Sequence, residues 1–205
     1  MAGNMDIAGI DRKARTAGYA DGLLELFAAA VLMILALGWI ANPAFVGILA
    51  AFVVLFGWRV VDRVKARVTY PRIGYFRERE DDTSTNPRGM LLFIAGSFVL
   101  VVVVVWLSGG IADPVEWRRA APLMSGISLS GGFWYLSDKS GLIRHRFVAV
   151  ASVLGGLGLW LFGSGNDYTG VVLHLAGLAV PLALLGAWSL LRFLRTNPVR
   201  RAEGQ

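Results

Sequence analysis

The sequence predicts an all-α membrane protein, a polytopic bundle of six transmembrane helices arranged as three hairpins. Two observations lead to this fold class. Hydrophobic residues make up 56% of the 205-residue chain, and they occur in long blocks that are almost free of charge. A soluble domain would instead distribute them at helical or strand periods. In addition, Lys and Arg are concentrated in every second segment that connects the blocks.

The apolar blocks predict the individual helices. Backbone N–H and C=O groups cannot remain unpaired in hydrocarbon, so each block is expected to be an α-helix. The fourth block is short and contains three serines, which favours packing against protein rather than lipid. Five spans with a re-entrant fourth segment are the alternative. The six blocks are 21–41, 44–61, 90–108, 120–136, 146–163 and 171–194.

The connecting segments predict the orientation. The N-terminus, 59–89, 137–146 and the C-terminus contain 3, 8, 3 and 4 basic residues, together 18 of the chain's 20. Because Lys and Arg collect on the cytoplasmic side, both termini are predicted to be cytoplasmic and the protein to lie in the cell membrane. The chain then divides into a cytoplasmic N-terminal segment (1–20), a transmembrane domain (21–195) that contains the basic cytoplasmic loop 59–89, and a cytoplasmic tail (196–205).

Tryptophans near the block ends suggest the three hairpins. The odd-numbered blocks carry a Trp at their expected outer ends, and the even-numbered blocks carry one toward the cytoplasm. Aromatic belts at both interfaces of any membrane bundle explain the same pattern. The outer residues are Trp39, Trp106 and Trp160, and the cytoplasmic ones Trp58, Trp134 and Trp188.

Two acids at the start of the first block are the main candidates for a functional site. Asp21 and Glu25 are four residues apart and share one helix face. Glu25 lies about 6 Å deeper than Asp21. A charge at the bilayer centre costs roughly 2.5–3.5 kcal/mol and less near the edge, so Glu25 is tolerable but is better paired. Favourable electrostatics at a helix N-terminus is the structural alternative.

The histidines and a proline give a second group of candidates. His174 and Pro181 lie on one face of the sixth block, where a proton relay or a gate is conceivable. A His hydrogen-bonded to a neighbouring helix is the simpler interpretation. His145 follows an Arg at a cytoplasmic helix start and is expected to meet lipid phosphate.

The stretch T-Y-P-R-I-G-Y ends the second helix. Block two continues beyond the membrane as an amphipathic helix whose arginines are expected to bind anionic headgroups, namely Arg59, Arg63 and Arg67. Pro71 cannot extend that helix and is expected to hold Tyr70 in extended geometry. Tyr70 and Tyr75 suit the membrane interface. We expect Arg72 to reach Asp21 or Glu25 across the helix ends.

Together, D-G-L-L-E-L at residues 21–26 and T-Y-P-R-I-G-Y at 69–75 resemble a D-G-L-x-E-L / Y-P-R-x-G-Y pattern in small prokaryotic polytopic membrane proteins that are uncharacterised. The resemblance covers only these two segments. It implies that both belong to one site, and it carries no activity.

The sequence contains no H-E-x-x-H, G-x-S-x-G or Walker motif. We therefore predict no catalytic residues, metal site or cofactor, and no nucleic-acid partner. The leading interpretation is a non-enzymatic accessory subunit whose basic cytoplasmic face binds anionic lipid, another protein or a further copy of the chain. The alternatives are a small transporter or channel that uses Asp21 and Glu25, and a lipid-headgroup enzyme with Glu25 as base and Arg72 as phosphate clamp.

Overall fold

The computed structural model describes residues 16, 18–73, 96, 99, 102–103, 106, 114–163 and 168–198. All regular secondary structure within these residues is helical, which confirms the predicted all-α class. The expected span 90–108 lies almost entirely outside the described residues. The helices are α2 (Leu23–Ala41), α3 (Pro43–Val68), α4 (Tyr70–Ile73), α6 (Pro114–Ser140), α7 (Arg144–Phe162) and α8 (Thr169–Thr196).

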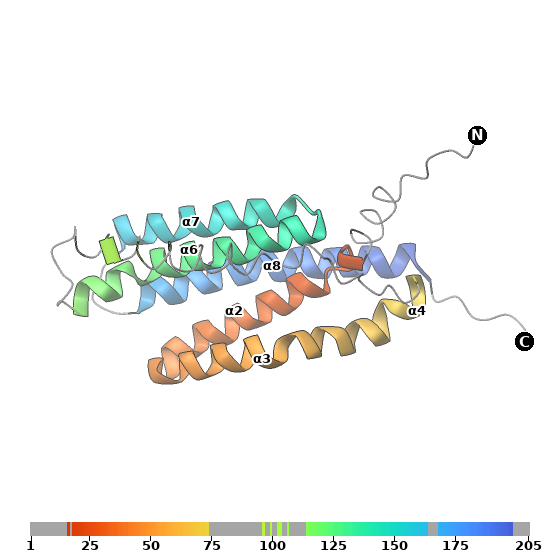
Figure 1. Ribbon diagram of the computed structural model, residues 1–205, viewed down its shortest axis with the longest axis horizontal. Helices are drawn as coiled ribbons and strands as arrows, with labels where there is room; N and C mark the ends of the chain where they lie inside the picture. The colour runs from red at the N-terminus through yellow and green to blue at the C-terminus, as the bar shows by residue number, and fades with distance from the viewer. Residues whose placement is uncertain are drawn as a thin grey trace, which may run out of the picture.

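The five long helices run roughly along one axis, and α8 lies at the centre of the bundle (Figure 1). It packs along α2 and also contacts α6 and α7. The expected hairpin partners α2 and α3 are in contact, as are α7 and α8. The more extensive interfaces, however, are α2 with α8 and α6 with α7, so they join different predicted hairpins.

One end of the bundle gathers the start of α2, the single turn α4, the turn between α6 and α7, and the end of α8 (Figure 1). We call it the basic end, because three of the four predicted basic segments reach it. At the opposite end the Trp39 ring, from the end of α2, packs against Tyr168 beside the start of α8, with ring centroids 4.6 Å apart.

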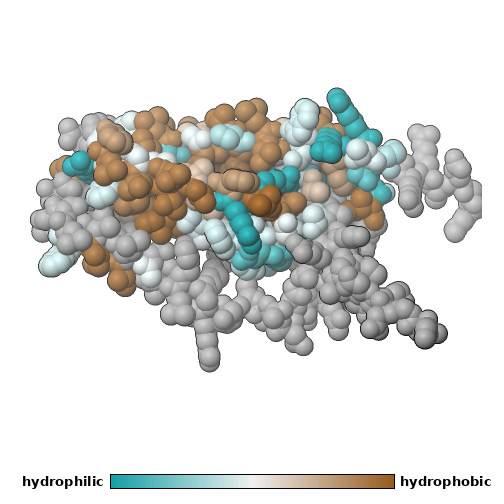
Figure 2. All heavy atoms as spheres, turned by 90° about the horizontal axis from the view of Figure 1, so that it is seen from above, coloured by the Kyte–Doolittle hydropathy of each residue, from teal (hydrophilic) through white to brown (hydrophobic). Residues whose placement is uncertain are grey.

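Within the part of the chain that the structure describes, three helices, α2, α7 and α8, are long and apolar enough to cross a membrane. Their surfaces carry large exposed apolar side chains, for example Ile40 at 67%, Phe147 at 69% and Leu184 at 68% exposure. Apolar side chains cover most of the left part of the face in Figure 2, and hydrophilic ones gather from the middle to the right-hand end. These helices therefore expose large apolar side chains on their outer surfaces, while Glu25 is buried inside the bundle.

The fourth predicted block is part of α6, an uninterrupted helix of 27 residues that packs on α7 and α8. Its crossing with α7 depends on small residues. A Cβ atom at Gly126 would lie 2.5 Å from the Ser152 carbonyl oxygen, and one at Gly156 would lie 2.5 Å from the Pro122 carbonyl oxygen. The Ser152 hydroxyl donates to the Gly126 carbonyl at 3.1 Å. The expected packing of this block against protein is therefore confirmed.

The helix of the second block ends at Val68, as Pro71 predicts, but Tyr70 is not extended. After the turn at Thr69, α4 forms one further helical turn with Pro71 in its second position. The Thr69 carbonyl accepts hydrogen bonds from the backbone N–H groups of Arg72 at 3.1 Å and Ile73 at 3.2 Å. Proline is tolerated there because a first-turn residue needs no intrahelical donor.

Candidate functional site

A cluster of buried polar side chains lies inside the basic end. Five of its members are at most 1% exposed, and α2, α7 and α8 all contribute residues. Burial of this many polar groups is favourable only if they bond to one another. We call this group the polar cluster; it consists of Asp21, Glu25, Thr69, Ser140, Arg144, His145 and Ser189.

Glu25 is the centre of the polar cluster. Its Oε1 atom lies 2.6 Å from Nη2 of Arg144 and 2.9 Å from Nε2 of His145. The other imidazole nitrogen, Nδ1, lies 3.0 Å from the Ser140 hydroxyl. One carboxylate therefore connects α2 to the start of α7 and, through His145, to the end of α6.

Arg144 extends these connections to α8. Its Nη1 donates to the Ser189 hydroxyl at 2.9 Å, and its Nη2 donates to the Tyr19 carbonyl at 3.1 Å. The guanidinium thus contacts the segment before α2, α2 itself and α8. A planar donor with several fixed N–H groups suits such a junction.

Asp21 connects α2 to the end of α3. The Thr69 hydroxyl donates to Oδ2 of Asp21 at 2.7 Å, and the backbone N–H of Leu23 donates to Oδ1 at 3.1 Å. Nearby, Lys65 donates to the Gly18 carbonyl at 3.0 Å, and its Nζ lies 4.4 Å from the Tyr19 ring centroid. Asp21 therefore both satisfies a donor at the α2 start and fixes the turn before α4.

The polar cluster requires a close approach of α2 and α8. Gly22 has a φ of +74°, and a Cβ atom there would lie 2.4 Å from the Gly186 carbonyl oxygen. A Cβ atom at Gly186 would in turn lie 2.8 Å from the Leu26 nitrogen. Only glycine fits both positions, and the resulting contact brings the start of α2 against Gly186 and Ser189 of α8.

The predicted pairing of Arg72 with Asp21 or Glu25 is not formed. Arg144 and His145 bond to Glu25 and Thr69 bonds to Asp21, whereas Nη1 of Arg72 donates to the Val68 carbonyl. The Nε atom of Arg72 is buried without a partner among the described residues. Tyr70 lies in α4, and Tyr75 lies outside the described residues.

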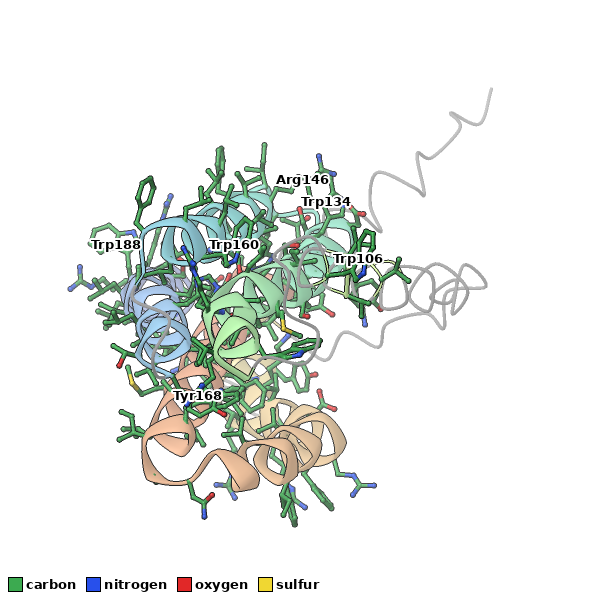
Figure 3. All side chains as sticks on the ribbon, turned by 90° about the vertical axis from the view of Figure 1, so that its left-hand side faces the viewer. Trp106, Trp134, Arg146, Trp160, Tyr168 and Trp188 are labelled. Carbon is green, nitrogen blue, oxygen red and sulfur yellow. The ribbon has the colours of Figure 1, made fainter. Side chains whose placement is uncertain are left out.

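His145 was expected at lipid phosphate, and this prediction is wrong, because the side chain is 1% exposed and belongs to the polar cluster. Its neighbour Arg146 faces outward instead. Arg146 pairs with Asp138 at 3.0 Å, and its guanidinium carbon lies 5.4 Å from the Trp134 ring centroid (Figure 3). On α3 the three arginines of the predicted headgroup-binding face are exposed, namely Arg59, Arg63 and Arg67.

The structure brings His174 and Pro181 together along a groove of about 380 Å³ between α7 and α8. The rest of its lining is apolar, including Leu159 and Leu173. His174 is 3% exposed, and its Nε2 has no hydrogen-bond partner among the described residues. Among the described residues, the expected hydrogen bond from His174 to a neighbouring helix is therefore not formed.

Three members of the polar cluster also have the composition of a catalytic triad. Ser140, His145 and Glu25 place a hydroxyl, an imidazole and a carboxylate in one row of hydrogen bonds. Each is only 1% exposed, however, and none of them lines either of the grooves at α8. The Ser140 hydroxyl is therefore enclosed in this structure, and the chain of bonds links α2, α6 and α7.

Sequence reasoning missed Arg144, Ser140 and Ser189. The available signal was R-H-R at 144–146, a cationic motif beside an apolar block that has no acid of its own. Within the described residues, no group of three His, Cys, Asp or Glu side chains is placed to hold a metal ion.

Comparisons with protein-family models, curated proteins and solved structures find no significant match for this chain. The function must therefore be inferred from the polar cluster, the exposed arginines and the grooves.

Proposed function

We propose that the chain is an integral protein of the cell membrane, with six transmembrane helices and both termini in the cytoplasm. Its basic end forms a cytoplasmic face that binds a partner protein, which makes the chain a non-enzymatic accessory subunit. The exposed apolar surfaces of α2, α7 and α8 support the membrane location. The four basic segments of the sequence support the orientation.

The observation that carries this proposal is that Asp21 and Glu25 are buried at the basic end, whereas the arginines of α3 are exposed. Asp21 and Glu25 are 0% and 1% exposed and are bonded inside the bundle. Both carboxylates therefore interact with groups inside the bundle and add no negative charge to its surface. The arginines of α3 remain at the surface, where they attract acidic groups of a partner or of the membrane.

The burial of the two acids favours this function over transport. A transporter or channel that used Asp21 and Glu25 as its mouth would keep at least one carboxylate in contact with water. Both carboxylates are instead enclosed, and Glu25 is paired with Arg144 at 2.6 Å. Opening such a mouth would leave the partly buried Arg144 guanidinium without its counter-charge.

Affinity capture of the full-length protein with a matched set of variants tests the proposal. The triple variant Arg59→Gln, Arg63→Gln, Arg67→Gln removes the exposed cations of α3. The control Arg118→Gln, Arg119→Gln removes cations at the opposite end. We expect one protein to co-purify in a fixed ratio, to be lost with the triple variant, and to be retained with the control.

Reconstitution of the purified pair then shows whether the contact is direct. Retention of the partner by the triple variant would contradict the proposal. So would solute flux in vesicles of the purified chain that Glu25→Gln abolishes, because the acid would then have a role in transport. Lipid turnover by the purified chain would equally contradict it.

A further inference from the structure

A second groove, of about 470 Å³, opens at the basic end between α4 and α8. We call it the α4–α8 groove. Ile73 of α4 borders one side, residues of the last three turns of α8 border the other, and Arg144 of the polar cluster also lines it. The turn at Thr69 and the helical geometry of Pro71 place Ile73 there. The groove is separate from the exposed arginines of α3.

The α8 wall of this groove changes from apolar to polar toward the end of the helix. Leu185 and Trp188 come first, and Trp188 is 69% exposed and projects outward from α8 (Figure 3). Arg192 lies about 6 Å further along the axis, on the same helix face. Asn197 follows at the end of the helix. A ligand with an apolar part and a polar head matches this gradient.

The polar part of the groove is positively charged. Arg192 is exposed and has no hydrogen-bond or ion-pair partner for its guanidinium among the described residues. Arg144 is held in place by Glu25 and Ser189, and its Nε is buried with no partner in the described part of the chain. Because Glu25 compensates one of the two guanidinium charges, the groove retains a net positive charge from Arg192. An anionic head complements it.

We propose that the α4–α8 groove binds a single anionic phospholipid. The phosphate lies at Arg192 near Asn197, and an acyl chain follows Leu185 and Trp188 toward the membrane. The inference rests on the proposed membrane location, which puts this end of α8 in the leaflet that holds anionic lipids. It differs from diffuse attraction to the α3 arginines, because a groove of about 470 Å³ takes the headgroup and the first part of one acyl chain of a single lipid at a fixed place.

Native mass spectrometry of the detergent-purified full chain tests the site. The probes are phosphatidylglycerol, phosphatidylcholine with the same acyl chains, and inorganic phosphate. We expect one phosphatidylglycerol to bind, with phosphatidylcholine and inorganic phosphate each roughly tenfold weaker or more. Arg192→Gln should weaken phosphatidylglycerol binding by roughly tenfold. Arg195→Gln is the matched control, because Arg195 is exposed on the same helix but does not line the groove.

Several results would overturn the site. Equal losses for Arg192→Gln and Arg195→Gln would indicate diffuse attraction. Equal binding of the two lipids would remove the role of charge, and equal binding of inorganic phosphate would remove that of the acyl chain. Trp188→Ala checks the last point, because it is expected to weaken the binding of phosphatidylglycerol but not that of inorganic phosphate.

Two results separate this inference from the proposed function. If Arg192→Gln keeps lipid binding while the α3 triple variant loses its partner protein, only this inference fails. Extraction of the chain from membranes by alkaline carbonate would instead refute the proposed function.

Discussion

The ion pair between Glu25 and Arg144 is expected to dominate the stability of the basic end. Its side chains are 1% and 23% exposed, and the charged atoms lie 2.6 Å apart. Glu25→Gln preserves the shape of the side chain but leaves the guanidinium without a counter-charge. Breaking a buried pair costs about 3–5 kcal/mol, which corresponds to a fall in Tm of roughly 6–20 °C for a chain of this size. Thermal unfolding in detergent measures it.

Asp138→Asn is the matched control for this substitution. It also removes an acid from an arginine pair, Arg146–Asp138 at 3.0 Å, but these side chains are 51% and 56% exposed. Exposed pairs contribute about 0–1 kcal/mol, so Tm should hardly change. Similar shifts for the two variants would show that the Glu25 pair is not the buried connection described above.

The two histidines allow a second comparison at the residue scale. Both are buried, at 1% exposure for His145 and 3% for His174. His145→Leu removes a bonded imidazole from Glu25 and Ser140, so it should cost about 1–3 kcal/mol. His174→Leu removes an Nε2 atom that has no partner among the described residues, so Tm should stay level or rise. A large loss of stability in the His174 variant, measured by thermal unfolding, would indicate that the imidazole has a binding partner.

The sequence identifies the acids of the polar cluster but not their partners. Asp21 and Glu25 are conspicuous because ionisable groups are rare beside an apolar block. Arg144 and His145 lie 119 and 120 positions after Glu25, and only the packing of both α2 and α7 against α8 brings them together. The expected α2–α3 hairpin predicts Arg72 as the partner of these acids, because it places the residues after α3 beside the start of α2.

At the scale of helices, the crossing of α2 and α8 depends on two glycines. Gly186→Ala would place a methyl group 2.8 Å from the Leu26 nitrogen and 2.9 Å from the Gly22 carbonyl oxygen. Because both neighbours are backbone, the helices must separate, and the bonds to Asp21 and Glu25 weaken with them. We expect a loss of about 1–3 kcal/mol, measured as a fall in Tm in detergent.

Gly177→Ala is the control within the same helix. A Cβ atom at Gly177 would have nothing within 4 Å, and Ala is preferred to Gly inside helices by about 1 kcal/mol. Its Tm should therefore stay level or increase. Equal destabilisation by the two substitutions would show that the α2–α8 contact is not limited by these backbones.

Two helix boundaries at prolines show what residue type predicts and what hydropathy alone leaves out. Pro71 excludes continuation of α3, and the helix ends at Val68 as expected. The same proline permits the first turn of α4, so Tyr70 is helical. The α6 helix begins at Pro114, before the apolar block at 120, because hydropathy detects the apolar part of a helix rather than its polar first turns.

At the scale of the whole molecule, hydropathy predicted helices but not their neighbours. The expected hairpin partners α2 and α3, and α7 and α8, are in contact, yet the more extensive α2–α8 and α6–α7 interfaces join different predicted hairpins. Association of membrane helices follows small residues that allow close contact, and such residues occur in several of these helices. A single sequence does not show which glycine faces which helix.

The orientation of the bundle is the central claim, and cysteine labelling tests it most directly. The chain contains no Cys, so a single introduced thiol reports one position. Asn42 lies in the turn between α2 and α3, and Ile143, 66% exposed, lies in the turn between α6 and α7 at the basic end. In intact cells a membrane-impermeant maleimide should label Asn42→Cys, whereas Ile143→Cys should react only after permeabilisation. Labelling of Ile143→Cys in intact cells would contradict a cytoplasmic basic end.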